Sequence, residues 1–453
     1  MKTLRVFESF AGVGSQRMAL RNIGVNFEIV GISEIDKNAI LAYDAIHENQ
    51  NLSVPEKTKE EMMEELQHAH VACCLPHGRN EIPQTEVELK RLYTAHKRSK
   101  NFGDITTIQT EDLPDMDLFT YSFPCTNISI CGKQAGFKKG SGTSSSLVWE
   151  CERIIRAKKP KYLMMENVKN ICSKSHMEDF QAWINLLNDI GYRSIWKVLN
   201  ANQYGVPQNR ERVIMLSILG EGDITFPEPI GNLLTLKDIL EERPNHQYIA
   251  YYDGEIPPSN PTRINRIDIV PKVKVRKYPV DIVGLQQCLR THKKYSNREI
   301  ATKLNKPISL VEHWFRTDKY FAIPSPDIWY ALKELLEITT TEFDASIMEF
   351  IIRNSVYDKA ARCYFESGIA PTITASSGNE KIITANGIRR LTSLECWRLQ
   401  GYLDEDYYKA KEIGQLAEQR LYERAGNGIA VPMLEALFRH LFADYISCSN
   451  VEN

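Results

Sequence analysis

The sequence lacks the patterns that identify several classes of protein. Its ten cysteines form no C-x-x-C pair and show no regular spacing, which argues against a zinc site and a disulfide framework. No apolar run approaches the roughly 18 residues of a membrane span, and the first residues lead into a strand without a signal-peptide pattern. We therefore expect reduced thiols, no metal, no membrane partner and a cytoplasmic location.

The sequence also lacks an excess of charge of either sign, since the net charge of the 453 residues is only −2. A hydrophobic content of 43% and a charged content of 25% describe an ordinary globular protein. The length allows two or three domains with a sizeable core.

The N-terminal segment predicts the first unit of a doubly wound sheet. Residues 4–10 have the pattern of a strand, residues 11–14 form a glycine-containing turn, and residues 15–23 have the pattern of a helix. Glycines at such a turn let a ligand approach the backbone at the start of a helix. The G-x-G pattern is weak by itself, and the third glycine of the dinucleotide fingerprint is missing.

The next strand, residues 27–33, ends at Glu34. A carboxylate there suits a ribose diol, although a charge at a helix N-terminus is the alternative. Residues 48–101 then have the pattern of an inserted helical segment in which we find no chemistry. The sheet is expected to resume near Asp104 and Ile105, where Asp104 could accept from an adenine amine and Ile105 could pack on the ring.

Two reactive side chains follow two further strands. Cys125 comes just after an apolar strand and Pro124, and Glu166 comes directly after residues 162–165. The carboxyl ends of parallel strands meet at one edge of a sheet, so we expect the two side chains near each other. Partial burial would raise the pKa of Glu166, so that it could hold a proton. Taken alone, the first could be a structural cysteine and the second a helix cap.

Two polar loops complete the candidate site. Residues 136–146 are rich in Gly, Ser and Lys, which is typical of a lid over a substrate, with a plain connector as the alternative. Arg210 and Arg212 alternate along an extended segment and are well placed to bind a phosphate or a base edge. An exposed charged hairpin is the alternative for that segment.

These motifs occur in an order that resembles the bacterial and phage DNA (cytosine-5)-methyltransferases of restriction-modification type. The resemblance covers residues 4–218 and 371–443, and its motifs are Phe10-Ala11-Gly12-x-Gly14, Phe123-Pro124-Cys125, Glu166-Asn167-Val168, Gln208-x-Arg210-x-Arg212, residues 389–402 and Gly426-Asn427-Gly428. It implies S-adenosylmethionine as methyl donor and a cytosine in double-stranded DNA as acceptor.

The resemblance also implies roles for single residues. Cys125 would be the nucleophile, Glu166 would contact the ring nitrogen and amine of cytosine, and Arg212 would bind the base, with Arg210 and Asn167 completing the catalytic set. Ser129 and Gln208 would contact DNA. Two positions depart from the family pattern, because Thr126 stands where Gln is usual and Ser144 where Arg is common. The cofactor site would be formed by Phe10, Ala11, Gly12, Gly14, Glu34, Ile35, Asp104, Ile105, Pro124, Leu147, Asn427 and Ile429.

The chemistry is consistent with these roles. Carbon 5 of cytosine becomes nucleophilic when a thiolate adds to carbon 6, and Glu166 would stabilise the resulting enamine at ring nitrogen 3. The thiolate of Cys125 requires a lowered pKa, which nearby arginines or a helix N-terminus could supply. The target base must also be flipped out of the duplex.

The middle of the chain predicts the element that reads DNA. Residues 296–305 and 310–318 have the pattern of a helix-turn-helix, followed by a third helix at 326–336. Residues 262–321 hold 14 Lys and Arg against 5 acidic residues, a basic footprint for DNA. A structural helical insertion is the alternative. The side chains expected to face base edges are Ser309, Glu312, His313 and Arg316.

We therefore predict a two-domain α/β enzyme with a doubly wound, mostly parallel, Rossmann-like methyltransferase sheet. Residues 1–225, completed by 422–453, would form the catalytic domain, and residues 226–421 a smaller DNA-recognition domain. The protein would be a monomer with double-stranded DNA as partner and a cognate restriction endonuclease as a functional one. Three alternatives are an RNA cytosine methyltransferase, an inactive sequence-specific DNA binder and a nucleotide-dependent oxidoreductase.

Overall fold

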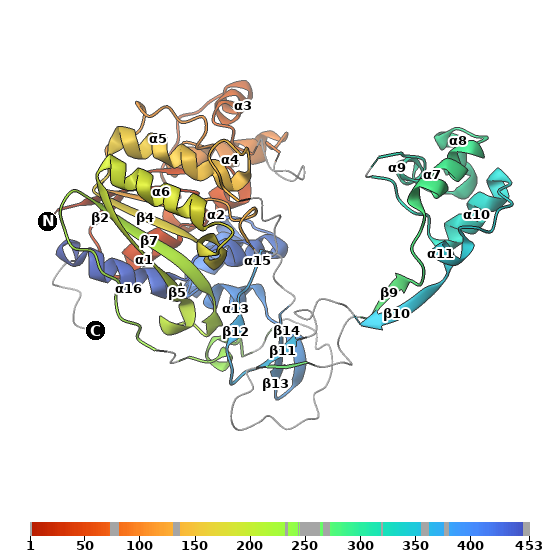
Figure 1. Ribbon diagram of the computed structural model, residues 1–453. Coiled ribbons are helices and arrows are strands. Elements are labelled where there is room, and N and C mark those ends of the chain that lie inside the picture. Colours follow the sequence, from red (N-terminus) through yellow and green to blue (C-terminus); the bar gives the residue numbers. More distant parts are fainter. Residues whose placement is uncertain are drawn as a thin grey trace. The chain divides into compact units, whose positions relative to one another are not determined.

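A computed structural model describes most of the chain and divides it into two compact units. The larger unit comprises residues 1–264 and 363–453, and the smaller unit residues 265–362 (Figure 1). The described residues are 2–72, 81–129, 136–231, 234–242, 244, 263–265, 272–318, 320–354, 362–375 and 380–446. Cys73, Cys74, Cys131 and the expected flexible connection at 376–379 lie outside them.

The larger unit is organised on a six-stranded sheet with the order β2-β1-β3-β4-β7-β5. The first four strands in that order are parallel, and β7 is antiparallel to both of its neighbours, so the predicted mostly parallel sheet is confirmed. The strands are β1 (Leu4–Ser9), β2 (Phe27–Ser33), β3 (Leu118–Tyr121), β4 (Tyr162–Val168), β5 (Tyr192–Asn200) and β7 (Glu211–Leu219).

Successive residues of the central strands enter two different cores. Val6 and Leu118 belong to one buried cluster, whereas their neighbours Phe7 and Phe119 belong to the other. This alternation follows from the two-residue period of a strand, and both faces of the sheet must therefore be covered. One face carries α1 (Ser15–Asn22) and α16 (Val431–Leu441), and the other carries α5 (Val148–Lys158) and α6 (Met177–Ile190) (Figure 1).

The inserted segment forms two helices that build a small core of their own. They are α3 (Lys59–His68), which begins with a capping box at Thr58, and α4 (Glu86–Arg98). Leu66 and Leu89 are fully buried in a cluster that also includes Ile40 of α2 (Lys37–His47). The insertion is therefore anchored to the sheet through α2.

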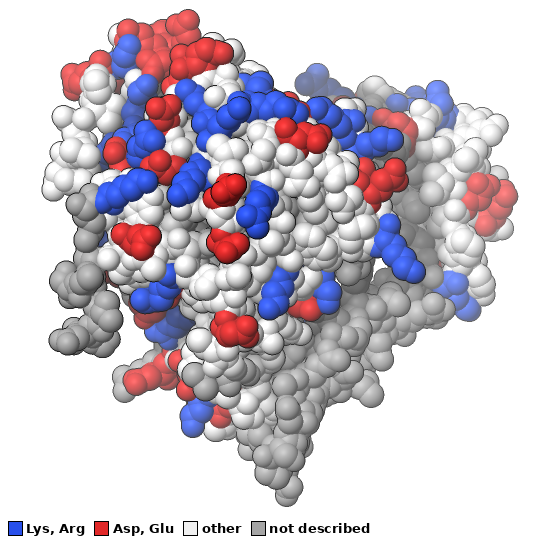
Figure 2. Space-filling view, turned by 60° about the vertical axis from the view of Figure 1, so that its left-hand side comes forward, with Lys and Arg blue, Asp and Glu red and all other residues white. Residues whose placement is uncertain are grey.

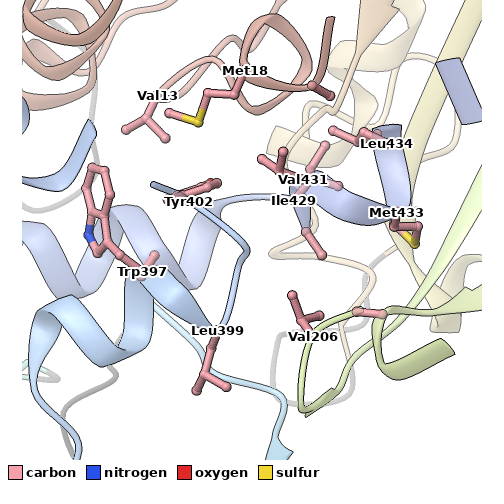
Figure 3. Close-up of a cluster of buried hydrophobic side chains, with 14 of the residues drawn as sticks. Val13, Met18, Val206, Trp397, Leu399, Tyr402, Ile429, Val431, Met433 and Leu434 are labelled. Atoms are coloured by element: carbon pink, nitrogen blue, oxygen red, sulfur yellow. The ribbon is translucent and has the colours of Figure 1, made fainter. Parts of the chain in front are cut away.

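The domain boundaries differ from those expected. Residues 363–421 belong to the larger unit, because Trp397, Leu399 and Tyr402 pack in the same core as Val13 and Met18 (Figure 3). The region contributes to a four-stranded sheet with the order β14-β13-β11-β8 and to a short β12-β6 pair, in which β8 (Arg263–Asn265) and β6 (Gln208–Asn209) come from earlier in the chain. The other elements of this part are β11 (Arg362–Phe365), β12 (Ala370–Pro371), β13 (Lys381–Thr384), β14 (Gly387–Arg390), α13 (Ser393–Arg398), α14 (Asp404–Tyr408), η6 (Lys409–Ile413) and α15 (Glu418–Asn427).

The smaller unit is mainly helical. The chain enters and leaves its helical part through an antiparallel pair of strands, β9 (Lys272–Arg276) and β10 (Phe350–Asn354). Its core includes Ile300, Val311, Trp314 and Trp329, which is consistent with the predicted apolar stripes. The expected helix-turn-helix is present, but its second helix ends at Trp314 instead of Asp318. The helices are α7 (Ile282–Thr291), α8 (Asn297–Leu304), α9 (Ile308–Trp314), α10 (Pro326–Leu336) and α11 (Asp344–Met348).

Candidate active site

A cavity of about 530 Å³ opens at the carboxyl edge of the parallel strands in the larger unit. The chain brings nearly all of the predicted cofactor and catalytic residues to its walls, although they lie up to about four hundred positions apart in the sequence. The cavity-lining residues that were predicted are Phe10, Ala11, Gly12, Glu34, Ile35, Asp104, Ile105, Pro124, Cys125, Leu147, Glu166, Asn167, Arg210, Arg212, Asn427 and Ile429.

The two glycines of the first turn have different tasks. Gly12 has φ +57°, and a Cβ there would meet nothing within 4 Å, so its backbone is open to a ligand in the cavity. Gly14 is not among the lining residues, which differs from our expectation. A Cβ at Gly14 would lie 2.5 Å from His47 Nε2, so this glycine permits the close packing of α1 against α2.

The Glu34 carboxylate organises the turn that follows β2. Its Oε1 accepts from the backbone N–H groups of Ile35 and Asp36, both at 2.8 Å, and its Oε2 accepts from Gly12 at 2.9 Å. Burial and the neighbouring Asp36 carboxylate raise the pKa of Glu34, and these hydrogen bonds oppose the rise. Oε2 accepts one backbone hydrogen bond and has a second lone pair for a ligand hydroxyl, which suits the predicted ribose contact.

Asp104 and Ile105 lie in a turn and not in a strand, contrary to our expectation. The inserted segment holds this turn, because the Asp104 N–H donates to the Ala69 carbonyl at 2.9 Å and the Ala72 N–H donates to the Ile35 carbonyl at 3.0 Å. The insertion therefore contributes to the shape of the cavity, a role that its polar sequence did not indicate.

The C-terminal part of the chain closes the cavity beside the first helix. The Ile429 N–H donates to Ser15 Oγ at 3.2 Å, and the Ser15 and Tyr402 hydroxyl oxygens lie 2.8 Å apart. A Cβ at Gly428 would lie only 1.8 Å from the Tyr402 hydroxyl oxygen, so a glycine is needed there. The close packing of Ile429, Tyr402 and Val13 is visible in Figure 3.

The Cys125 segment is fixed through its backbone. Asn167 Nδ2 donates to the Phe123 carbonyl at 3.0 Å, and Ser145 Oγ donates to the Pro124 carbonyl at 2.6 Å. The Ser129 N–H donates to the Cys125 carbonyl at 2.8 Å, which closes a turn just after the thiol. Asn167 thus supports the segment before Cys125 from β4, the strand that also carries Glu166.

Glu166 and Arg212 form an ion pair with a distance of 3.0 Å between Oε1 and Nε. Burial raises the pKa of Glu166, as expected, and the Arg212 and Arg210 charges oppose this effect. Burial and the Glu166 charge also raise the pKa of the Cys125 thiol, while the two arginines act against it. The expected lowering of the Cys125 pKa is therefore wrong for the protein without substrate, because burial outweighs the arginine charges.

Gln208 and Arg210, on the extended segment before β7, are buried and not exposed as residues of a DNA-contacting face would be. Gln208 is fully buried, donates to the Leu399 carbonyl at 2.7 Å and accepts from the Ile373 N–H at 3.1 Å. Its predicted contact with DNA is therefore wrong. Arg210 is 2% exposed and donates to the carbonyls of Ile373, Gly426 and Gly428 at 2.9, 3.0 and 2.6 Å. This arginine joins the C-terminal segment to the cavity wall.

Two charged residues of the cavity wall were not predicted from the sequence. Asp36 and Arg424 line the cavity beside Glu34 and are 2.8 Å apart between Oδ2 and Nη2. Asp36 adjoins Glu34 in the sequence, which was a signal. No spacing or motif links Arg424 to Asp36, so their contact could not be found from the sequence.

The predicted DNA-reading residues lie in the smaller unit. Ser309, Glu312, His313 and Arg316 are all exposed, and Arg316 pairs with Asp318 at 2.5 Å.

Positive and negative side chains are intermixed over most of the face shown in Figure 2, apart from a row of Lys and Arg across its upper part. The near-neutral net charge of the chain therefore does not exclude local basic surfaces.

Comparison with known proteins gives the family. The model of C-5 cytosine-specific DNA methylases matches residues 4–76 and 78–443. The chain belongs to this family. Members use S-adenosylmethionine as methyl donor, and the reaction of this protein is the transfer of a methyl group to carbon 5 of cytosine in DNA.

Curated relatives support the assignment over the whole chain. The type II methyltransferase M2.ScrFI of Lactococcus lactis subsp. cremoris is 35% identical over 445 residues, covering 97% of this chain and 99% of the relative. The orphan methyltransferase M.SssI of Spiroplasma monobiae is 30% identical over 458 residues, covering 96% of each.

Two solved structures share the fold at lower identity. A Dnmt2 methyltransferase of S. pombe has a TM-score of 0.51 and 14% identity, covering 97% of this chain and 99% of its own. A putative DNA modification methyltransferase encoded within an Escherichia coli prophage has a TM-score of 0.50 and 16% identity, with the same coverage.

Within the described residues, no helix is long and apolar enough to cross a membrane, and no cluster of His, Cys, Asp and Glu has the form of a metal site.

Proposed function

We propose that Cys125, Glu166 and Arg212 carry out the methylation in the described cavity, on a cytosine flipped out of a specific double-stranded DNA sequence. The observation that carries this proposal is that one cavity holds a thiol, a buried carboxyl paired with an arginine, and the Gly12–Glu34 turn. The thiol and the carboxyl supply the two functions that cytosine activation needs, a nucleophile and a stabiliser of the ring nitrogen.

The chain's own residues divide the reaction between them. The Cys125 thiolate adds to carbon 6 of the flipped cytosine, and the electrons move toward ring nitrogen 3. Burial raises the pKa of Glu166, which favours the sharing of a proton between its carboxyl and that nitrogen as the charge develops. Arg212 fixes the orientation of the Glu166 carboxyl. Once carbon 5 has accepted the methyl group, loss of its proton to a base and departure of the Cys125 thiolate restore the aromatic ring.

The cofactor end of the cavity fits S-adenosylmethionine. Gly12 leaves its backbone open, Glu34 offers carboxylate oxygens for the ribose hydroxyls, and Asp104 and Ile105 offer an acceptor and an apolar surface for adenine. When bound, this cofactor supplies the methyl group as an electrophile. Phe10, Pro124, Leu147 and Asn427 would complete its walls.

The smaller unit is proposed to read the target sequence. Its helix-turn-helix presents Ser309, Glu312, His313 and Arg316 to solvent, as residues that read base edges must be. Ser129, near Cys125, would contact the DNA. We further propose that the protein acts as a monomer in the cytoplasm, with a cognate restriction endonuclease as a functional partner.

Bisulfite sequencing of DNA treated with the purified protein and S-adenosylmethionine tests the proposal. We expect 5-methylcytosine within one recurring sequence and none after Cys125→Ser substitution. A Cys151→Ser variant is the matched control, since that buried cysteine lies in α5 and does not line the cavity. Methylation that persists in Cys125→Ser would overturn the catalytic assignment. Bound DNA without methylation would favour the binder or the RNA enzyme, and tRNA would be the next substrate.

A further inference from the structure

Among the residues that the structure describes, three arginines line the cavity, and they lie near different acidic groups. The Arg210 and Arg212 charges act on Cys125 and Glu166, at the reacting end. The Arg424 charge acts on Glu34 and Asp36, at the cofactor end. Arg424 comes from α15, near the C-terminus of the family match, and pairs across 388 positions of sequence with Asp36. This contact is not required by the reaction as derived above.

Asp36 has two structural partners. Its Oδ1 accepts from the backbone N–H groups of Asn38 and Ala39 at 2.8 and 3.4 Å, which caps α2. Its Oδ2 accepts from Arg424 Nη2 at 2.8 Å. Both oxygens are therefore occupied, and the Asp36 side chain fixes the turn between β2 and α2.

The same turn holds Glu34. The Asp36 N–H donates to Glu34 Oε1, so a displacement of Asp36 moves the carboxylate proposed to bind the ribose. The two carboxylates also repel each other, and the positive charge of Arg424 offsets this repulsion. It helps to lower the pKa of Asp36 and opposes the rise in the pKa of Glu34. Arg424 is 6% exposed, so few water molecules could replace its charge.

The geometry points to Arg424 as a positioning residue for S-adenosylmethionine: it neutralises and holds Asp36, and through Asp36 it keeps the Glu34 carboxylate in place for the ribose. This inference rests on the proposed assignment of Glu34 to the cofactor. Arg424 itself needs no contact with the cofactor in this role. Since the Cys125 end of the cavity has its own arginines, Arg424 governs cofactor affinity and not the chemical step.

Binding of S-adenosylhomocysteine, measured by isothermal titration calorimetry, provides a readout that does not depend on activity. We expect R424Q to weaken binding on the order of tenfold, to raise KM for S-adenosylmethionine similarly and to leave kcat within about twofold. R420Q is the matched control, because Arg420 lies one turn earlier on α15, pairs with Glu423 at 2.6 Å and does not line the cavity. We expect R420Q to bind like the wild type.

A double variant separates positioning from direct contact. D36N keeps a residue that caps helices well but removes the charge, so D36N/R424Q leaves no unpaired carboxylate at position 36. We expect this double variant to regain most of the affinity lost in R424Q. Affinity that stays low would overturn the positioning role, as would an R424Q variant that binds normally or loses kcat and affinity equally.

Two further results keep the test decisive. If R424Q does not fold, R424K is compared with R420K. R424K keeps the positive charge without the planar guanidinium and should bind S-adenosylhomocysteine a few-fold more weakly than R420K. Equal binding by R424K and R420K would then overturn the inference. Failure of the folded wild type to bind S-adenosylhomocysteine would instead overturn the assignment of the cavity to the cofactor.

Discussion

The Thr126 hydroxyl oxygen lies 3.1 Å from the Ser144 hydroxyl oxygen, so the two positions that depart from the family pattern contact each other. Asn127 Nδ2 also donates to Ser144 Oγ, at 2.9 Å. These bonds join the segment after Cys125 to η1 (Ser144–Leu147), whose last residue, Leu147, lines the cavity. The departures thus form one polar contact between two walls of the site.

This contact predicts a defect in catalysis and not in cofactor binding. Ser144→Ala removes both hydrogen bonds, each worth about 0.5–1.5 kcal/mol at most in this exposed position. We expect kcat to fall roughly 2- to 10-fold, with unchanged affinity for S-adenosylhomocysteine. Ser141→Ala is the control, since that serine is exposed and its hydroxyl oxygen lies 3.1 Å from Thr143 Oγ1. Equal kcat values for the two variants would contradict the prediction.

Alkylation of Cys125 reports its pKa without DNA. The thiolate reacts with iodoacetamide, and burial raises the pKa of this thiol above its ordinary value of 9.0. We expect the rate to rise with pH and to reach half its maximum above pH 9, followed by mass spectrometry of the Cys125 peptide.

Two neighbours of Cys125 should change that rate in opposite directions. Glu166→Gln removes a negative charge that raises the Cys125 pKa, so alkylation at pH 8 should become faster. Arg212→Gln removes a positive charge that lowers it, so alkylation should become slower. A change of the same sign in both variants would show that altered access to the thiol dominates.

The buried Glu8 carboxyl predicts a pH-dependent stability. It accepts from the Tyr43 hydroxyl at 2.6 Å and from the Arg17 N–H at 3.0 Å, and burial raises its pKa from 4.5 to about 6. The folded state therefore holds the proton more tightly than the unfolded state. Its contribution is fully present below pH 4.5 and is lost as the pH rises through 6.

The loss amounts to about 2 kcal/mol, from a shift of roughly 1.5 pKa units. Urea unfolding between pH 4.5 and 7 measures this loss as the difference in the free energy of unfolding between the wild type and Glu8→Gln. The glutamine of the variant does not titrate over this interval. We expect this difference to change by that amount over the interval. Glu28→Gln, at an exposed position on β2, should show no such change. A pH-independent difference for Glu8→Gln would refute the prediction.

Arg316 tests the role of the smaller unit. If its guanidinium contacts DNA, Arg316→Ala should weaken binding and reduce the slope of log affinity against log salt by about one. The substitution also leaves the Asp318 carboxylate without its Arg316 partner at 2.5 Å, and this negative charge should repel the DNA phosphates. Arg290→Ala removes an equal charge from the exposed surface of α7, outside the helix-turn-helix. Equal salt slopes for both variants would contradict a role in DNA binding.

Local patterns accounted for much of the catalytic unit. The glycine turn before α1, the apolar strand that ends before Glu34 and the apolar residues that lead to Glu166 are features of a few adjacent residues. The structure has them where expected, although β4 continues through Glu166 to Val168. The helix-turn-helix was likewise predictable from capping and apolar spacing at 296–304. Such features depend on backbone and side-chain preferences that act within a few residues.

The errors arose where distant parts of the chain meet. Gln208 has a polar sequence context, yet Leu399 and Ile373 enclose its amide. The boundary at residue 421 was wrong because Trp397 packs in the core of the large unit. Burial of that kind is a property of the assembled fold, and the sequence near each residue carries no sign of it.

The sequence by itself determined the family, the α/β class and the order of the reactive residues, because these follow from local motifs and their succession. Only the tertiary structure decided which side chains face the cavity, what burial does to the Cys125 pKa, and that Arg424 meets Asp36. Burial and charge act through space, and they become defined when the chain brings residues from its two ends to one edge of the sheet.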